Sequence, residues 1–229
     1  MKANYRLGAV GGFEIFLHWT FSTMMVGLFG YYLITHGSVF VAIQALTFIA
    51  AVFGSVILHE LGHAFMARRF GIPTLDITMY PIGGVARLER MPTEPRQELL
   101  IAVAGPAVNI AIGIGLLMLG TMSGWTLSNG FLAQNSGLIE NVMKANFFLA
   151  VFNLIPAFPM DGGRVLRALL AMKMRYKSAT TVASFVGQGI AGLFFLFGLA
   201  QLNIVLMFIG MFVFVGARQE ALVVSQTHT

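Results

Sequence analysis

The chain has 229 residues, of which 57% are hydrophobic and only 10% are charged. This composition excludes an ordinary soluble domain, in which about 25% of the residues are charged. Several stretches reach the roughly 20 apolar residues that a helix needs to cross a bilayer. We therefore expect an all-α polytopic membrane protein. The net charge is +5, but Lys and Arg lie beside the apolar stretches, where they orient a protein in the membrane. We expect the chain to contact a lipid bilayer, and we expect it to bind no nucleic acid.

Six transmembrane helices are predicted, and together they make a single transmembrane domain over residues 1–229. Residues 7–12 precede them as a strand or loop at the interface, and residues 121–136 are expected to form a loop. The alternative is that the last two spans fuse into one helix, which would place the C-terminus on the opposite side. The expected spans are residues 15–34, 38–67, 97–120, 138–155, 180–200 and 203–217.

Residues 72–92 interrupt the series of apolar helices. From Thr74 to Met79 the apolar residues Leu75, Ile77 and Met79 alternate with polar ones, which is typical of a strand. A turn and a second strand complete a small membrane-associated β-hairpin between the second and third spans. The hairpin is either a connector at the interface or an open edge with which an extended peptide pairs.

The basic residues test the number of spans. With six spans, thirteen of the fourteen Lys and Arg residues lie on one side. Lys144 is the exception, and Glu140 one turn earlier can pair with it. The positive-inside rule then predicts that both termini are cytoplasmic in a multi-pass protein of the cell membrane. Residues 164–177 resemble a basic helix that lies on the surface.

The run His59-Glu60-Leu61-Gly62-His63 lies at the end of the second predicted span. Two histidines four residues apart lie on one face of a helix and can bind one metal ion, and the glutamate can act as a general base. Arg68 and Arg69 follow within two turns, so this site is expected near the cytoplasmic face.

Catalytic zinc usually takes three protein ligands and leaves one position open. The chain has no cysteine, so the third ligand must be an Asp, Glu or His. The candidates are Glu14, His18, Glu140 and Asp161. Glu140 lies on the far side, and Glu14 and His18 at the entrance of the first span suit an interfacial role better.

Asp161 is the favoured third ligand. It follows a helix that two prolines interrupt, and Gly162-Gly163 allow close approach of neighbouring backbone. An ionisable residue at membrane depth indicates function. The alternative is that Asp161 pairs with Arg164 as a surface helix cap.

Taken together, these motifs resemble the site-2 protease family of intramembrane zinc metalloproteases. The resemblance rests on the His-Glu-x-x-His run and on Asn153-Leu-Ile-Pro-x-x-Pro-x-Asp161-Gly-Gly. The stretches Ala104-Gly-Pro-x-x-Asn109 and Leu17-His-Trp-Thr20 are similar to the same family. The resemblance covers nearly the whole chain.

The resemblance implies a role for each matching residue. His59, His63 and Asp161 would bind one Zn²⁺ per chain, and Glu60 would activate water. Asn153 would hold the substrate or the oxyanion, although it could instead make a hydrogen bond between helices. In the hairpin, Gly83-Gly84 would contact an extended substrate.

The implied activity is that of a zinc metalloendopeptidase, which hydrolyses a peptide bond in or near the transmembrane helix of a single-span membrane protein. The chain resembles the transmembrane core of members that continue into paired cystathionine-β-synthase-type domains. Two alternatives come from other classes: a metal transporter or sensor, and a catalytically inactive scaffold that binds membrane helices. The sequence predicts no particular oligomeric state.

Overall fold

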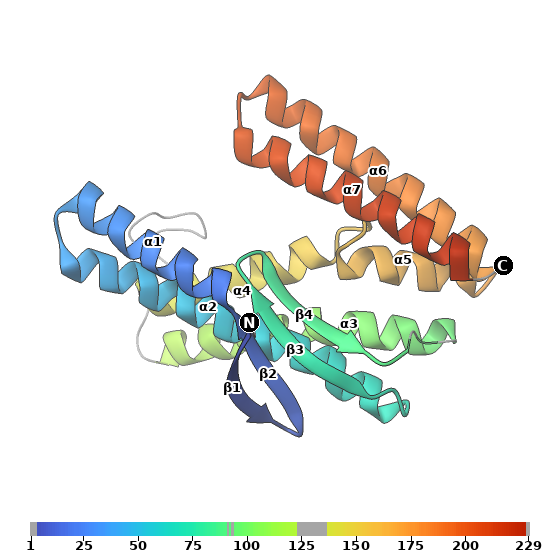
Figure 1. Ribbon diagram of the computed structural model, residues 1–229, viewed down its shortest axis with the longest axis horizontal. Coiled ribbons are helices and arrows are strands. Elements are labelled where there is room, and N and C mark those ends of the chain that lie inside the picture. The colour runs from blue at the N-terminus through green and yellow to red at the C-terminus, as the bar shows by residue number, and fades with distance from the viewer. Residues whose placement is uncertain (1–3, 91, 93, 123–136, 228–229) are drawn as a thin grey trace. The chain divides into compact units, whose positions relative to one another are not determined.

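The computed structural model describes residues 4–90, 92, 94–122 and 137–227, and most of the predicted loop at 121–136 lies outside them. Contacts divide the chain into two units. The first unit comprises residues 1–91 and 107–150, and the second comprises 92–106 and 151–229. In chain order the elements are β1 (Asn4–Val10), β2 (Phe13–His18), α1 (Trp19–His36), α2 (Val39–Arg69), β3 (Thr74–Tyr80), β4 (Gly83–Leu88), α3 (Pro95–Met122), α4 (Leu138–Asn153), α5 (Asp161–Ala171), α6 (Tyr176–Ala200) and α7 (Ile204–Thr227) (Figure 1).

Four helices among the described residues are long and apolar enough to cross a membrane, namely α2, α3, α6 and α7. The chain is therefore a mostly helical, multi-pass membrane protein with a small sheet. α1 has 18 residues and α4 has 16, and neither is among the four. Four of the six predicted spans coincide with these helices, and the crossing of the membrane by six helices stays a prediction.

The breaks between helices follow local backbone chemistry. Gly37 ends α1 in the left-handed conformation with φ 63°, which glycine adopts without strain. The Ser38 side chain then accepts a hydrogen bond from the Val41 backbone and caps α2. At the other end of the chain, α6 and α7 are separate helices and not one fused helix.

The small sheet has four strands in the order β1-β2-β3-β4. β2 pairs with β1 in antiparallel fashion and with β3 in parallel fashion, while β3 and β4 form the predicted hairpin. The prediction that a helix begins at residue 15 is wrong, because residues 13–18 form β2. An apolar run of this length fits a strand or a helix equally well, and the β3 partner lies far along the chain.

The alternation predicted for β3 holds only in part. Ile77 and Met79 are buried, as expected, but Leu75 is exposed and Asp76 is buried. Thr78 is buried as well, so residues 76–79 are covered on both faces of the strand, and the register of β3 against β4 shifts between Thr74 and Asp76. The side chain of Asp76 is bound by Arg87 of β4.

The sheet packs on the metal-binding end of α2. Phe13, Ile77 and Met79 from the sheet form one buried cluster with Leu61 and Ala64. Leu61 lies inside the His-Glu-x-x-His run, so the apolar face of the sheet holds the helix turn that carries the two histidines.

In the second unit, the prolines end α4 as predicted, and α5 begins at Asp161. A Cβ on Gly162 would lie 2.2 Å from the carbonyl oxygen of Ile155, so only glycine fits there. The glycine pair therefore lets the turn after α4 fold back directly on the first turn of α5.

The prediction of a basic helix on the surface over residues 164–177 is wrong at its centre. Arg167 on α5 is fully buried. Its Nε donates to Glu98 Oε1 (2.9 Å), and its Nη1 donates to Glu220 Oε1 (2.5 Å). Charge counts alone could not show this, because the two carboxylates lie on α3 and α7, far from Arg167 in the sequence.

Candidate metal centre

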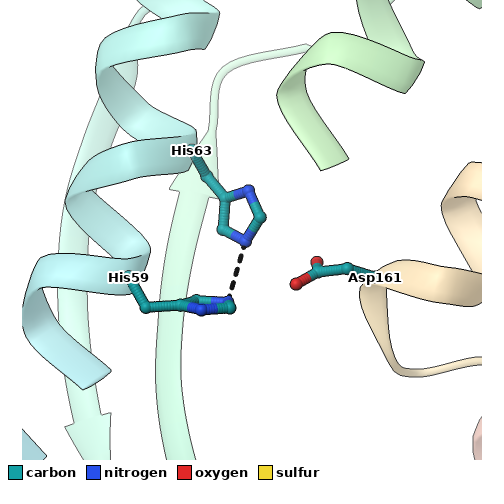
Figure 2. Close-up of side chains that lie close together, drawn as sticks. All are labelled: His59, His63 and Asp161. Atoms are coloured by element: carbon teal, nitrogen blue, oxygen red, sulfur yellow. Dashed lines mark hydrogen bonds between the residues drawn. The ribbon is translucent and has the colours of Figure 1, made fainter. Parts of the chain in front are cut away.

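His59 and His63 occupy successive turns of α2, and both are buried. Their Nε2 atoms lie 3.0 Å apart, so the two rings converge on one point (Figure 2). Helical spacing of four residues produces this convergence. The predicted pair of nitrogen donors is thus present on one helix face.

Asp161 is the first residue of α5 and is only 8% exposed. Its burial disfavours a cap at the surface, and its role as a zinc ligand stays a prediction. The candidate ligand atoms of His59, His63 and Asp161 all lie within 4.8 Å of one another (Figure 2). Two imidazole nitrogens and one carboxylate oxygen suit zinc. This donor set supports a single zinc ion.

The ring of His59 makes a second contact, on the side away from His63. Its Nδ1 lies 2.5 Å from Asn109 Oδ1 on α3. Asn109 donates through Nδ2 to Asn146 Oδ1 on α4, at 2.9 Å. Metal-binding histidines commonly donate their other ring N–H to an oxygen in this way.

Sequence reasoning assigned Asn109 and Asn146 no role at the metal. In the sequence, Asn109 belongs to the Ala-Gly-Pro-x-x-Asn stretch that is similar to the site-2 protease family. That stretch was the available signal, since a buried amide in an apolar helix needs a partner.

Glu60 lies beside the sheet. A Cβ on Gly84 would come within 2.6 Å of Glu60 Cγ and 3.2 Å of Glu60 Oε1. The backbone of β4 therefore lies directly against this carboxylate side chain. β4 is also an outer strand of the sheet. Its neighbour Gly83 has φ 140°, a backbone conformation that favours glycine.

The other candidate ligands, His18, Glu14 and Glu140, make contacts with neighbouring residues. His18 caps α1 through a hydrogen bond from the Thr20 backbone, and its ring lies 4.9 Å from the Tyr80 ring. Glu14 pairs with Arg6 at 2.9 Å. The predicted pair of Glu140 with Lys144 is confirmed at 2.8 Å.

Asn153 is the last residue of α4 and is half-buried. Its role in holding the substrate or the oxyanion stays a prediction, as do the substrate contacts of Gly83 and Gly84.

Two comparisons with known proteins agree with this site. The model described as "Peptidase family M50" matches residues 47–145 and 133–199 of the chain. The "Zinc metalloprotease MJ0392" of Methanocaldococcus jannaschii is 39% identical over 224 residues. The alignment covers 98% of this chain and 62% of that relative, so the chain spans less than two thirds of the relative's length.

A solved structure supports the fold independently. The "Site-2 Protease from Methanocaldococcus jannaschii" superposes with a TM-score of 0.69 at 38% sequence identity, and the match covers 95% of both chains. The likeness therefore extends over nearly all of the fold described above.

Proposed function

Because this chain belongs to peptidase family M50, we propose that it is an intramembrane zinc metalloprotease. In this proposal it hydrolyses a peptide bond in or near the transmembrane helix of a membrane-protein substrate. The observation that carries the proposal is the buried His59, His63 and Asp161 group with Glu60 on the same helix turn. A zinc site with a purely structural role would not need that glutamate.

The chemistry divides between the metal and the protein. When bound, zinc supplies a Lewis acid for the scissile carbonyl and lowers the pKa of water toward about 7. Glu60 takes the proton of the attacking water and delivers it to the leaving amine nitrogen as the peptide bond breaks. Asn153 stabilises the oxyanion or holds the substrate backbone.

The position of β4 suggests how a substrate binds. An outer strand can pair with an extended peptide through main-chain hydrogen bonds. Gly84 lies against Glu60, so a peptide beside Gly83 and Gly84 comes close to the general base. A helix hides its peptide bonds, so the substrate must unwind locally, and Gly or Pro in the substrate helix favours cleavage because both weaken a helix.

The sheet also supports the proposal of six spans. β2 precedes α1, β3 follows α2, and the two strands are parallel neighbours in one sheet. The chain must therefore return to the membrane face from which it left. Since α2 is long enough to cross, α1 is proposed to cross as well.

The other parts of the proposal rest on the sequence. Both termini and the active site face the cytoplasm, the substrates are single-span membrane proteins, and the chain works in a lipid bilayer without nucleic acid. The resemblance to members with cystathionine-β-synthase-type domains stays a prediction.

The test compares the wild type with Glu60→Gln in detergent or liposomes, measuring zinc content and cleavage of a model single-span substrate. Glu14→Gln is the control, because it removes an acid of the same unit that pairs with Arg6 at the surface. We expect all three proteins to bind one zinc ion per chain. Cleavage should be lost only in Glu60→Gln.

Other outcomes would favour the competing functions. Cleavage that persists in Glu60→Gln would contradict the role of Glu60. If zinc binds but the wild type cleaves no substrate with a Gly- or Pro-containing span, a scaffold becomes the better explanation. Zinc uptake into liposomes that depends on His59 would instead indicate a transporter.

A further inference from the structure

Three helices of the first unit contribute to a buried polar chain behind His59. The chain runs from His59 on α2 to Asn109 on α3, then to Asn146 on α4, and returns to Ser55 on α2. Asn109 and Asn146 are completely buried, and Ser55 is 5% exposed. Polar groups at such depth are costly unless every one of them is paired.

The far end of this chain sets its direction. Asn146 Nδ2 lies 2.9 Å from the Val142 carbonyl oxygen and 3.0 Å from Ser55 Oγ. A carbonyl oxygen can only accept, so the amide nitrogen of Asn146 must be at that end. The Ser55 hydroxyl donates to the Ala51 carbonyl (3.2 Å), which leaves its oxygen as an acceptor for Asn146.

The direction passes from one amide to the next. Because its nitrogen is turned toward Val142, Asn146 presents Oδ1 to Asn109. Asn109 must therefore donate to this oxygen through Nδ2. Asn109 therefore presents its own Oδ1 to His59. Since that oxygen only accepts, Nδ1 of His59 must carry the ring proton. The lone pair of the neutral ring is then on Nε2, the atom that lies 3.0 Å from His63 Nε2.

We propose that Asn109, Asn146 and Ser55 form a directional hydrogen-bond chain that sets the tautomer and ring orientation of His59 for metal binding. They are positioning residues, because they act on the metal through His59. The proposal deepens the function proposed above and rests on the same zinc site. It gives a role to three polar residues whose burial in an apolar helix bundle would otherwise only cost stability.

The decisive variants are Asn109→Leu and Asn109→Asp. Leu has a similarly branched side chain without the acceptor, whereas Asp keeps an oxygen at the Oδ1 position and loses the Nδ2 donor. Ser184→Ala is the matched control, because Ser184 is equally buried in the second unit and donates to the Ala217 carbonyl (2.6 Å) with no link to His59. Zinc affinity is measured by competition with a chromophoric chelator, so that no cleavage is needed.

We expect Asn109→Leu to weaken zinc binding by about 10- to 100-fold, which is the usual effect of losing such a partner. Asn109→Asp keeps an acceptor for His59 but cannot donate to Asn146 Oδ1, so it should lose less affinity than Asn109→Leu. Ser184→Ala should leave the affinity unchanged. Thermal unfolding of the metal-free proteins measures the loss of stability, which is the effect that a merely structural role of Asn109 predicts. Zinc affinity in Asn109→Leu within twofold of the wild type would overturn the proposal.

A second measurement separates this proposal from the zinc protease itself. Nitrogen-15 NMR of histidine-labelled, metal-free protein reports which ring nitrogen of His59 is protonated, with the signal assigned from its loss in His59→Asn. The wild type should show the Nδ1–H tautomer, and Asn146→Leu should shift the population toward Nε2–H. If the wild type shows Nε2–H, the proposal fails even if zinc binds. If Nδ1–H is found but no zinc binds, the proposed function fails while the hydrogen-bond chain stands.

Discussion

The two units bury polar side chains in opposite ways. In the first unit, the chain from His59 to Ser55 consists of uncharged groups that each donate onward. In the second, Arg167 is bound by Glu98 and Glu220, which are charged. A chain of neutral groups fixes the direction of hydrogen-bond donation at little desolvation cost. An ionic cluster joins helices firmly, but each ion costs several kcal/mol to bury.

The ionic cluster around Arg167 joins helices of the second unit. Arg167 lies on α5, Glu98 on α3 and Glu220 on α7, so one guanidinium connects three helices of the second unit. Burial lowers the pKa of Arg167, but the charge of Glu98 opposes this, and the net pKa lies above its usual value. Rings of Phe158 and Tyr176 also lie 4.9 and 5.0 Å from its charged carbon.

The largest effect is expected for Arg167→Met. Removing the guanidinium leaves two carboxylates together, and breaking such a buried pair costs about 3–5 kcal/mol of unfolding free energy. Arg175→Met is the control, since Arg175 is exposed. Denaturant or thermal unfolding of the metal-free proteins measures both. If the two variants unfold alike, the cluster does not stabilise this unit.

A smaller loss is expected for Asn146→Leu, which interrupts the neutral chain. The Nδ2 group of Asn109 then loses its acceptor, and an unpaired buried donor costs about 1–3 kcal/mol. The double variant Asn109→Leu/Asn146→Leu should cost less than the sum of the single variants, because it leaves no orphaned amide between them. Strict additivity in unfolding experiments would show that the two amides do not act as one chain.

Ser55→Ala tests the end of the same chain and should have a modest effect. One of the two acceptors of Asn146 is lost, while the Val142 carbonyl still sets the direction. A typical buried hydrogen bond contributes about 0.5–1.5 kcal/mol to stability. In chelator competition, zinc affinity should fall less than in Asn146→Leu. A greater fall would place the directing contact at Ser55 instead.

The smallest change in stability is expected for Gly84→Ala, although its effect on cleavage is large. The new methyl group meets the flexible Glu60 side chain and not backbone, so Glu60 can move aside. Zinc content should stay at the wild-type level while cleavage falls. Gly54→Ala is the control, because a Cβ there meets nothing within 4 Å. Normal cleavage by Gly84→Ala would remove β4 from the proposed active site.

Sequence patterns were sufficient where the chemistry is local. The spacing of His59 and His63 and the prolines before Asp161 depend on neighbouring residues, and the structure places them as predicted. The burial of Arg167 was missed because its partners come from distant helices. Asn109 was noticed as polar, but its partner His59 could not be identified without knowing which helices pack together.

The sheet also shows that partners distant in the sequence cannot be identified from local patterns. Residues 15–18 are predicted as the start of the first span, and the sequence alone does not reveal their strand because the neighbour β3 follows only after two complete helices. The pairing of β3 with β4 can be predicted because the two strands are adjacent in the chain, whereas the association of this hairpin with the membrane stays a prediction. The burial of Asp76 and Thr78 on the second face of β3 has no signature in the residues of this strand.

The parallel pairing of β2 with β3 also determines the order in which the protein can fold. Residue 15 pairs with residue 77, so the sheet cannot close until the ribosome has produced both intervening helices. At about 5–20 residues per second, this delay is roughly 3–12 s. During that time the β1–β2 hairpin has an unpaired edge, and an isolated hairpin is at best marginally stable. The β1–β2 hairpin therefore gains its parallel neighbour only after α1, α2 and β3 have been synthesised.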